Sequence, residues 1–146
     1  MSHTRPVLTE RTAAVAWARA WNTCDISGLA PLLADDLRIA DQTRWTPMVG
    51  ARYFIGLASD YFDCVRDLGD RATMELATAP GDRRWNLPPR PCVVEYRSGR
   101  PVYTVLFDVR GGRIRRVEKR LLPPPTDCAL SGVFPGLEDA LLGEVN

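Results

Sequence analysis

The chain has 146 residues, of which 45% are hydrophobic and 25% are charged, and its formal net charge is +1. This size and composition are typical of one globular domain, so we assign residues 1–146 to a single domain with its core at about 7–122. A nearly neutral charge provides no general attraction to nucleic acid or to an anionic membrane surface. No run approaches the roughly 20 apolar residues that cross a bilayer, and the first ten residues lack a signal-peptide core, so we expect a cytoplasmic protein.

Histidine and cysteine narrow the chemistry that we expect. The only histidine is His3, close to the N-terminus, which excludes Ser-His-Asp and Cys-His nucleophiles and argues against a zinc site. The four cysteines, Cys24, Cys64, Cys92 and Cys128, lie far apart and form no C-x-x-C pair, so we expect buried thiols and no metal. Any reaction must then use carboxylates, phenols, indoles, lysine or arginine.

Helical periodicity characterises the first half of the chain. Apolar residues recur at i, i+3, i+4 and i+7 over about 7–23, which predicts an amphipathic helix. Asp25 is a good N-cap for a short second helix ending near residue 34. After a short strand at 37–41 and a loop, a third helix is predicted at about 51–66.

The second half of the chain alternates between apolar and polar residues, as β-strands do. The predicted strands cover residues 71–78, 92–97, 102–110 and 113–122. Three prolines at 123–125 end the sheet, and the tail beyond them could form a short helix at 137–142. Helices followed by antiparallel strands predict an α+β architecture with helices on one face of a bent sheet, a layout that often leaves a cavity between the layers.

Several short stretches, taken in this order, resemble the NTF2-like superfamily and in particular its ketosteroid-isomerase and SnoaL-like members. These stretches are Cys24-Asp25-Ile26, Leu33-Ala34-Asp35-Asp36, the strand that ends at Asp41, Gly50 before the third helix, and the segment from Phe107 to Ile114. Over the later strands the match to ketosteroid isomerase requires a gap, because the hairpin around Gly99 is shorter in this chain. The resemblance does not extend into the tail. It implies a cystatin-like α+β roll, in which three N-terminal helices pack on a curved, mostly antiparallel sheet and enclose an apolar pocket.

Asp41 is the first candidate for chemistry. Strand parity places it on the same face as Leu37 and Ile39, and the resemblance puts it at the position of the isomerase's catalytic aspartate, which moves a proton beside a carbonyl. A carboxylate in apolar surroundings is a better general base, because its charged form is disfavoured there. The alternative is that Asp41 caps a turn over residues 41–43, since aspartate is a favoured turn residue.

An isomerase also needs hydrogen-bond donors at the oxygen of the developing enolate. By resemblance, the isomerase's tyrosine position holds Trp17, and the position of its second donor falls at Tyr103 or Val105. The set of donors therefore differs, and we do not expect steroid isomerisation. The Trp17 indole and the Tyr103 hydroxyl could each donate a hydrogen bond, although aromatic residues at such spacings also serve as core packing.

Lys119 is the second unusual residue. It shares the strand parity of Val117 and Leu121, so its ammonium is expected in the pocket, where it needs a partner, most simply Asp41. It could instead bind an anionic or carbonyl-bearing ligand, or be solvated at a twisted sheet edge. We interpret the basic run at 113–120 as a solvated face and expect no nucleic-acid partner.

The leading hypothesis is a cofactor-free, SnoaL-like enzyme that isomerises, cyclises or dehydrates a small apolar carbonyl compound. Asp41 would be the base, and Tyr103 or Trp17 the oxyanion donor. Further residues expected to contact the substrate are Trp21, Phe54, Tyr61, Met74 and Lys119. The alternatives are a binding protein with the same pocket and no turnover, and a homodimeric interaction module that uses the outer sheet face at Val102 and Leu106.

Overall fold

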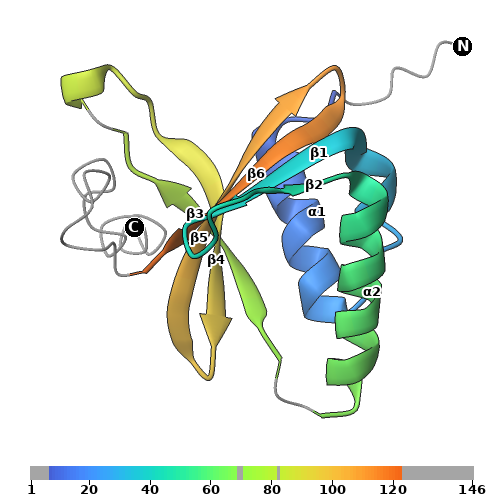
Figure 1. The fold of residues 1–146 in the computed structure, drawn as a ribbon. Helices are drawn as coiled ribbons and strands as arrows, with labels where there is room; N and C mark the ends of the chain where they lie inside the picture. Colours follow the sequence, from blue (N-terminus) through green and yellow to red (C-terminus); the bar gives the residue numbers. More distant parts are fainter. Residues whose placement is uncertain (1–6, 69–70, 82, 123–146) are drawn as a thin grey trace, which may run out of the picture.

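The computed structural model describes residues 7–68, 71–81 and 83–122, which form a curved sheet of six strands with two α-helices side by side on one face (Figure 1). The strands are β1 Leu33–Asp41, β2 Met48–Val49, β3 Thr73–Ala79, β4 Arg90–Arg97, β5 Arg100–Arg110 and β6 Arg113–Leu121. They lie in the order β2-β1-β6-β5-β4-β3, and every neighbouring pair is antiparallel except β1 and β6, which are parallel. The α+β class and the mostly antiparallel sheet predicted from the sequence are confirmed.

The two helices begin and end at local signals. α1 (Glu10–Thr23) starts with a reciprocal pair of hydrogen bonds between Thr9 and Thr12, and it ends at Cys24, which adopts the left-handed conformation with φ 53°. α2 (Ala51–Arg66) follows Gly50, whose φ of 105° suits glycine because no Cβ opposes it. α1 packs on β3, β4 and β5, whereas α2 packs on β1 and β2, so together the helices cover the inner face of the sheet.

The prediction of a third N-terminal helix, the short one after Asp25, is wrong. Asp25 instead accepts the backbone N–H of Ser27 at 2.9 Å, and a 3-10 helix, Ala30–Leu32, leads into β1. Gly28 loses much conformational entropy in a helix, and Pro31 has no N–H to donate to one, so this segment cannot continue as an α-helix.

Other differences from the predicted elements are smaller. β1 begins four residues earlier than predicted, and β2 was predicted as loop. Cys24 and Cys92 are buried as expected, but Cys64 is exposed on α2, outside the apolar stripe of that helix. The predicted tail helix at 137–142 and Cys128 lie outside the described residues. Neither of the two α-helices described has the length and apolar content needed to cross a membrane.

Aromatic side chains dominate the core between the helices and the sheet. The ring of Trp17 on α1 stacks on Phe54 of α2 with centroids 5.4 Å apart, and it meets Phe107 of β5 edge-on at 5.6 Å. Trp21, one turn further along α1, lies 5.4 Å from the ring of Tyr61. Because the rings come from both helices and the sheet, they set the separation between the two layers.

The outer face of the sheet carries a second, smaller apolar cluster. Its buried members are Ala77, Ala79, Cys92, Val94 and Leu106. Leu106, which the sequence assigned to a dimer interface, is thus already buried, whereas Val102 is partly exposed. Self-association through this face stays a prediction.

Charged residues also pair on the outer face, around Glu118. Its carboxylate accepts hydrogen bonds from Arg120 Nη2 at 2.6 Å and Nε at 3.2 Å, and its other oxygen lies 3.1 Å from Arg116 Nε. Burial opposes ionisation of this carboxyl group, but the hydrogen bonds from Arg120 and the positive charges of Arg120, Arg116 and Arg90 outweigh that effect and lower the pKa of Glu118.

We predict that Phe107→Ala lowers the free energy of unfolding by about 3–5 kcal/mol, because it removes a buried ring that supports Trp17. Tyr53→Ala, an equivalent truncation at an exposed ring on α2, should change it by less than about 0.5 kcal/mol. Urea unfolding of both variants is the measurement. Similar losses in the two variants would contradict the packing described above.

A second prediction concerns acid stability. Because folding lowers the pKa of Glu118, its stabilising effect is complete above the ordinary glutamate pKa of about 4.3 and disappears as the pH falls through the lower folded value. Glu118→Gln should therefore be less stable than the wild type at pH 7, and the difference should shrink below about pH 4. Unfolding free energies measured from pH 7 to pH 3 test this; a difference that does not change with pH contradicts it.

Candidate functional site

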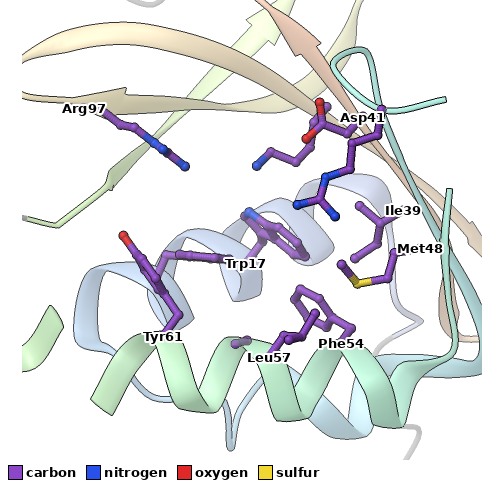
Figure 2. Close-up of a pocket in the computed structure, with 12 residues that line it drawn as sticks. Trp17, Ile39, Asp41, Met48, Phe54, Leu57, Tyr61 and Arg97 are labelled. Atoms are coloured by element: carbon purple, nitrogen blue, oxygen red, sulfur yellow. The ribbon is translucent and has the colours of Figure 1, made fainter. Parts of the chain in front are cut away.

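A pocket of about 220 Å³ opens between the two helices and the inner face of the sheet (Figure 2). Its apolar lining consists of Trp17, Trp21, Ile39, Met48, Phe54, Leu57, Ala58 and Tyr61, and its charged lining of Asp41, Arg44, Arg97 and Lys119. Figure 2 shows Phe54 and Leu57 on one side, Asp41 on the opposite side, and Trp17 between them. The hollow thus has an apolar floor and a charged rim.

Asp41 lies at the end of β1 and lines the pocket. Its Oδ1 accepts two hydrogen bonds from Thr43, from the backbone N–H at 2.9 Å and from the hydroxyl at 2.7 Å. The carboxylate therefore closes the turn over residues 41–43, as the alternative interpretation expected, and the residue also lines the hollow. Its second oxygen, Oδ2, accepts no hydrogen bond from the part of the chain that the structure describes, so it is available to a ligand.

Lys119 also lines the pocket, beside Asp41, since the two residues are register partners across β1 and β6. Its ion-pair partner among the described residues is Glu95, with Nζ 3.4 Å from Oε1, and not Asp41 as the sequence suggested. The ammonium also lies 4.3 Å from the centre of the Tyr103 ring, close enough for a cation–π contact.

Glu95 is a site residue that the sequence analysis missed. It is buried on β4, and its Oε2 accepts a hydrogen bond from Arg97 Nε at 3.0 Å while Oε1 pairs with Lys119. A buried carboxylate is costly unless cations compensate it, so the arrangement depends on both partners. One signal was present in the sequence: Glu95 has the strand parity of the apolar Val93, which placed an acid on a buried face.

The indole nitrogens of Trp17 and Trp21 are buried, and neither has a hydrogen-bond partner among the residues described. A buried donor without an acceptor costs about 1–3 kcal/mol. In Figure 2 the nitrogen of Trp17 lies on the edge of the ring that is turned away from Phe54 and toward the side where Asp41 and Arg97 lie. The nitrogen is buried in this structure, so this N–H can donate to an acceptor atom of a bound molecule only if the side chains around it move.

The remaining predicted site residues divide into two groups. Trp21, Phe54 and Tyr61 line the pocket. Tyr103 and Met74 are not among its described lining residues: Tyr103 lies beneath the Lys119 ammonium, and Met74 is a core residue whose backbone pairs with the Asn22 side chain. Across residues 7–68, 71–81 and 83–122, histidine, cysteine and acidic side chains form no group of three that could hold a metal ion.

No protein-family model matches the chain, and no curated protein is similar to it in sequence. Solved structures match it in fold. An NTF2-like protein of unknown function from Cytophaga hutchinsonii superposes with a TM-score of 0.56 at 10% identity, over 82% of this chain and 96% of that one. A SnoaL-like protein of unknown function from Burkholderia thailandensis gives 0.56 at 14% identity, over 80% and 98%. A Kribbella flavida protein, provisionally described as a ketosteroid isomerase, gives 0.53 at 17% identity, over 89% and 85%. The chain therefore has the fold of the NTF2-like superfamily, as the short stretches in its sequence implied.

Proposed function

We propose that the chain binds a small apolar carbonyl compound in this pocket and moves a proton on it without a cofactor, with Asp41 as the base. One observation carries the proposal: Asp41 and Trp17 line the same apolar hollow, and the described residues leave both the Asp41 Oδ2 and the buried indole N–H of Trp17 without a hydrogen-bond partner. A base and a hydrogen-bond donor on the same site are what enolisation requires.

The proposed reaction begins with the substrate carbonyl oxygen accepting the N–H of Trp17. Asp41 Oδ2 then takes a proton from the carbon next to the carbonyl, and the electron pair of that C–H bond moves to the oxygen as an enolate. The hydrogen bond strengthens as the oxygen gains charge, so it stabilises the transition state more than the ground state. The positive charge of the Lys119 ammonium, beside Asp41 in the sheet, attracts the negative charge that develops on the enolate.

The fate of the enolate defines the reaction class. In an isomerisation, protonated Asp41 returns the proton to a different carbon of the same molecule. In a cyclisation, the enolate carbon attacks a second carbonyl of the substrate, whose oxygen then receives the proton. In a dehydration, a β-hydroxyl leaves and departs as water with that proton. All three classes use the same base and need no redox partner.

A binding protein with the same pocket and no turnover is the second candidate. The observation that favours it is the pair of hydrogen bonds from Thr43 to Asp41, which gives the carboxylate a structural role in the turn. The two candidates differ in whether removing the negative charge of Asp41 affects proton transfer.

We predict that Asp41→Asn abolishes proton transfer and preserves binding. Asparagine keeps an oxygen acceptor for both bonds from Thr43, so the turn should survive while the base is lost. With 2-acetonaphthone as a probe, NMR in D₂O should show that the wild type accelerates deuterium exchange of the methyl protons beside the carbonyl, and that the variant does so at least about 100-fold less. Asp36→Asn, the same change at an exposed position of β1, is the matched control and should exchange like the wild type.

If the probe binds and its exchange is no faster than in buffer, or if Asp41→Asn exchanges as fast as the wild type, the base assignment is wrong. Binding that persists without exchange would favour the second candidate.

A further prediction tests the proposed hydrogen bond from the Trp17 indole N–H to the substrate. Trp17→Phe keeps an aromatic ring in the stack and removes the N–H, so catalysed exchange of 2-acetonaphthone should fall by about 100-fold, the usual loss for an oxyanion donor. Trp21→Phe removes the other unpartnered indole N–H from the same pocket wall and serves as the comparison. Equal losses in both variants would mean that the effect comes from altered packing and not from the hydrogen bond of Trp17.

A further inference from the structure

The charged rim of the pocket holds more positive than negative charge. Arg44, Arg97 and Lys119 line it together with Asp41, and within the described residues Arg97 and Lys119 form their ion pairs with Glu95. Each oxygen of Glu95 engages a different cation, at 3.0 Å for Arg97 and at 3.4 Å for Lys119. One carboxylate is therefore shared by two full positive charges.

The burial of these three side chains decides which of them meets a ligand. The side chain of Glu95 is 2% exposed, that of Lys119 is 16% exposed and that of Arg97 is 58% exposed. Lys119 and Arg97 line the hollow, whereas Glu95 lies behind them in the wall. Glu95 is thus a positioning residue: it draws both cations against the sheet while they stay in contact with the pocket.

Both cations keep donors for a further partner. Arg97 bonds to Glu95 through Nε, and within the described residues its two terminal nitrogens make no hydrogen bond. Figure 2 shows its guanidinium directed into the pocket. Lys119 has three N–H donors, and its known partners are one oxygen of Glu95 and the face of the Tyr103 ring.

From this arrangement we propose that the pocket selects ligands that carry a carboxylate, bound by Lys119 and Arg97 while the apolar body lies on the aromatic floor. A carboxylate only accepts hydrogen bonds, and its two oxygens match the fork of an arginine and the point charge of a lysine. The inference rests on the proposed function, whose substrate it narrows to a small apolar acid with a carbonyl group. A pocket of about 220 Å³ limits the apolar body to one or two rings.

Two probes of equal shape test the charge preference. 2-Naphthoate and 2-naphthamide share the same rings and differ in the negative charge, so isothermal titration calorimetry of the wild type compares their dissociation constants directly. We expect naphthoate to bind at least tenfold more tightly. If naphthamide binds equally well or better, the carboxylate proposal is overturned and the proposed function stands. If neither probe binds, the proposed function fails together with it.

Substitutions in the pocket test which residues cause naphthoate to bind more tightly than naphthamide. Arg97→Gln also leaves Glu95 with one cation, but glutamine keeps an amide N–H donor at this exposed position and Lys119 stays in place, so folding should tolerate it. It is expected to weaken naphthoate binding about tenfold and to change naphthamide binding less than twofold. Arg115→Gln, which removes a cation of β6 that pairs with Asp36 and does not line this pocket, is the control. Lys119→Met alone leaves Glu95 with one cation and could misfold, so the double variant Glu95→Gln/Lys119→Met removes both charges together.

The double variant should lose the preference for naphthoate. The ratio of the two dissociation constants is the decisive readout, since a general loss of pocket structure weakens both probes alike. A ratio that stays at the wild-type value in both Arg97→Gln and the double variant refutes the proposed carboxylate site.

Discussion

Trp17 holds the two layers of this protein apart, and the pocket depends on that separation. Its indole lies between Phe54 of α2 and Phe107 of β5, so a single side chain of α1 contacts both the neighbouring helix and the sheet. Aromatic rings fill this space without flexible chains, which keeps the layers at a defined distance. A small aliphatic residue in place of the aromatic ring would let the helices approach the sheet and close the hollow. The same indole carries a buried N–H without an acceptor among the described residues.

The charged rim adds a second constraint, because ionised groups in a partly buried site must compensate one another. Glu95 is compensated by Lys119 and Arg97, and these three side chains reach one another from β6 and β4 across the inner face of the curved sheet. Asp41 is held differently, by two hydrogen bonds from Thr43 to one of its oxygens. The two carboxylates thus have distinct environments: Glu95 is held between cations inside the wall, and Asp41 keeps one oxygen without a hydrogen bond from the described residues.

The similarity to solved structures stops at the fold. At identities of 10–17%, the superpositions show that the helices and strands share a common arrangement, but they assign no role to the side chains of the pocket. Folds of this kind host many functions, so the chemistry must be argued from the residues at the rim. Here the pocket residues combine a carboxylate, a buried indole N–H and an excess of cations, and this combination is the reason for proposing a carbonyl substrate that also bears a carboxylate.

The sequence by itself determined most of the helices and strands and the direction of several side chains, because periodicity and strand parity are local properties. It predicted α2 at the residues where the structure has it, the mostly antiparallel sheet, and Asp41 and Lys119 on the pocket face. It wrongly predicted an α-helix around Gly28 and Pro31, because these two residues oppose an α-helix and outweigh the good N-cap at Asp25. Only the tertiary structure decided that Lys119 pairs with Glu95 instead of Asp41, and that Tyr103 supports Lys119 while Met74 lies in the core. These contacts join residues from different strands, and the distance between such residues follows from sheet order and curvature, which no local pattern encodes.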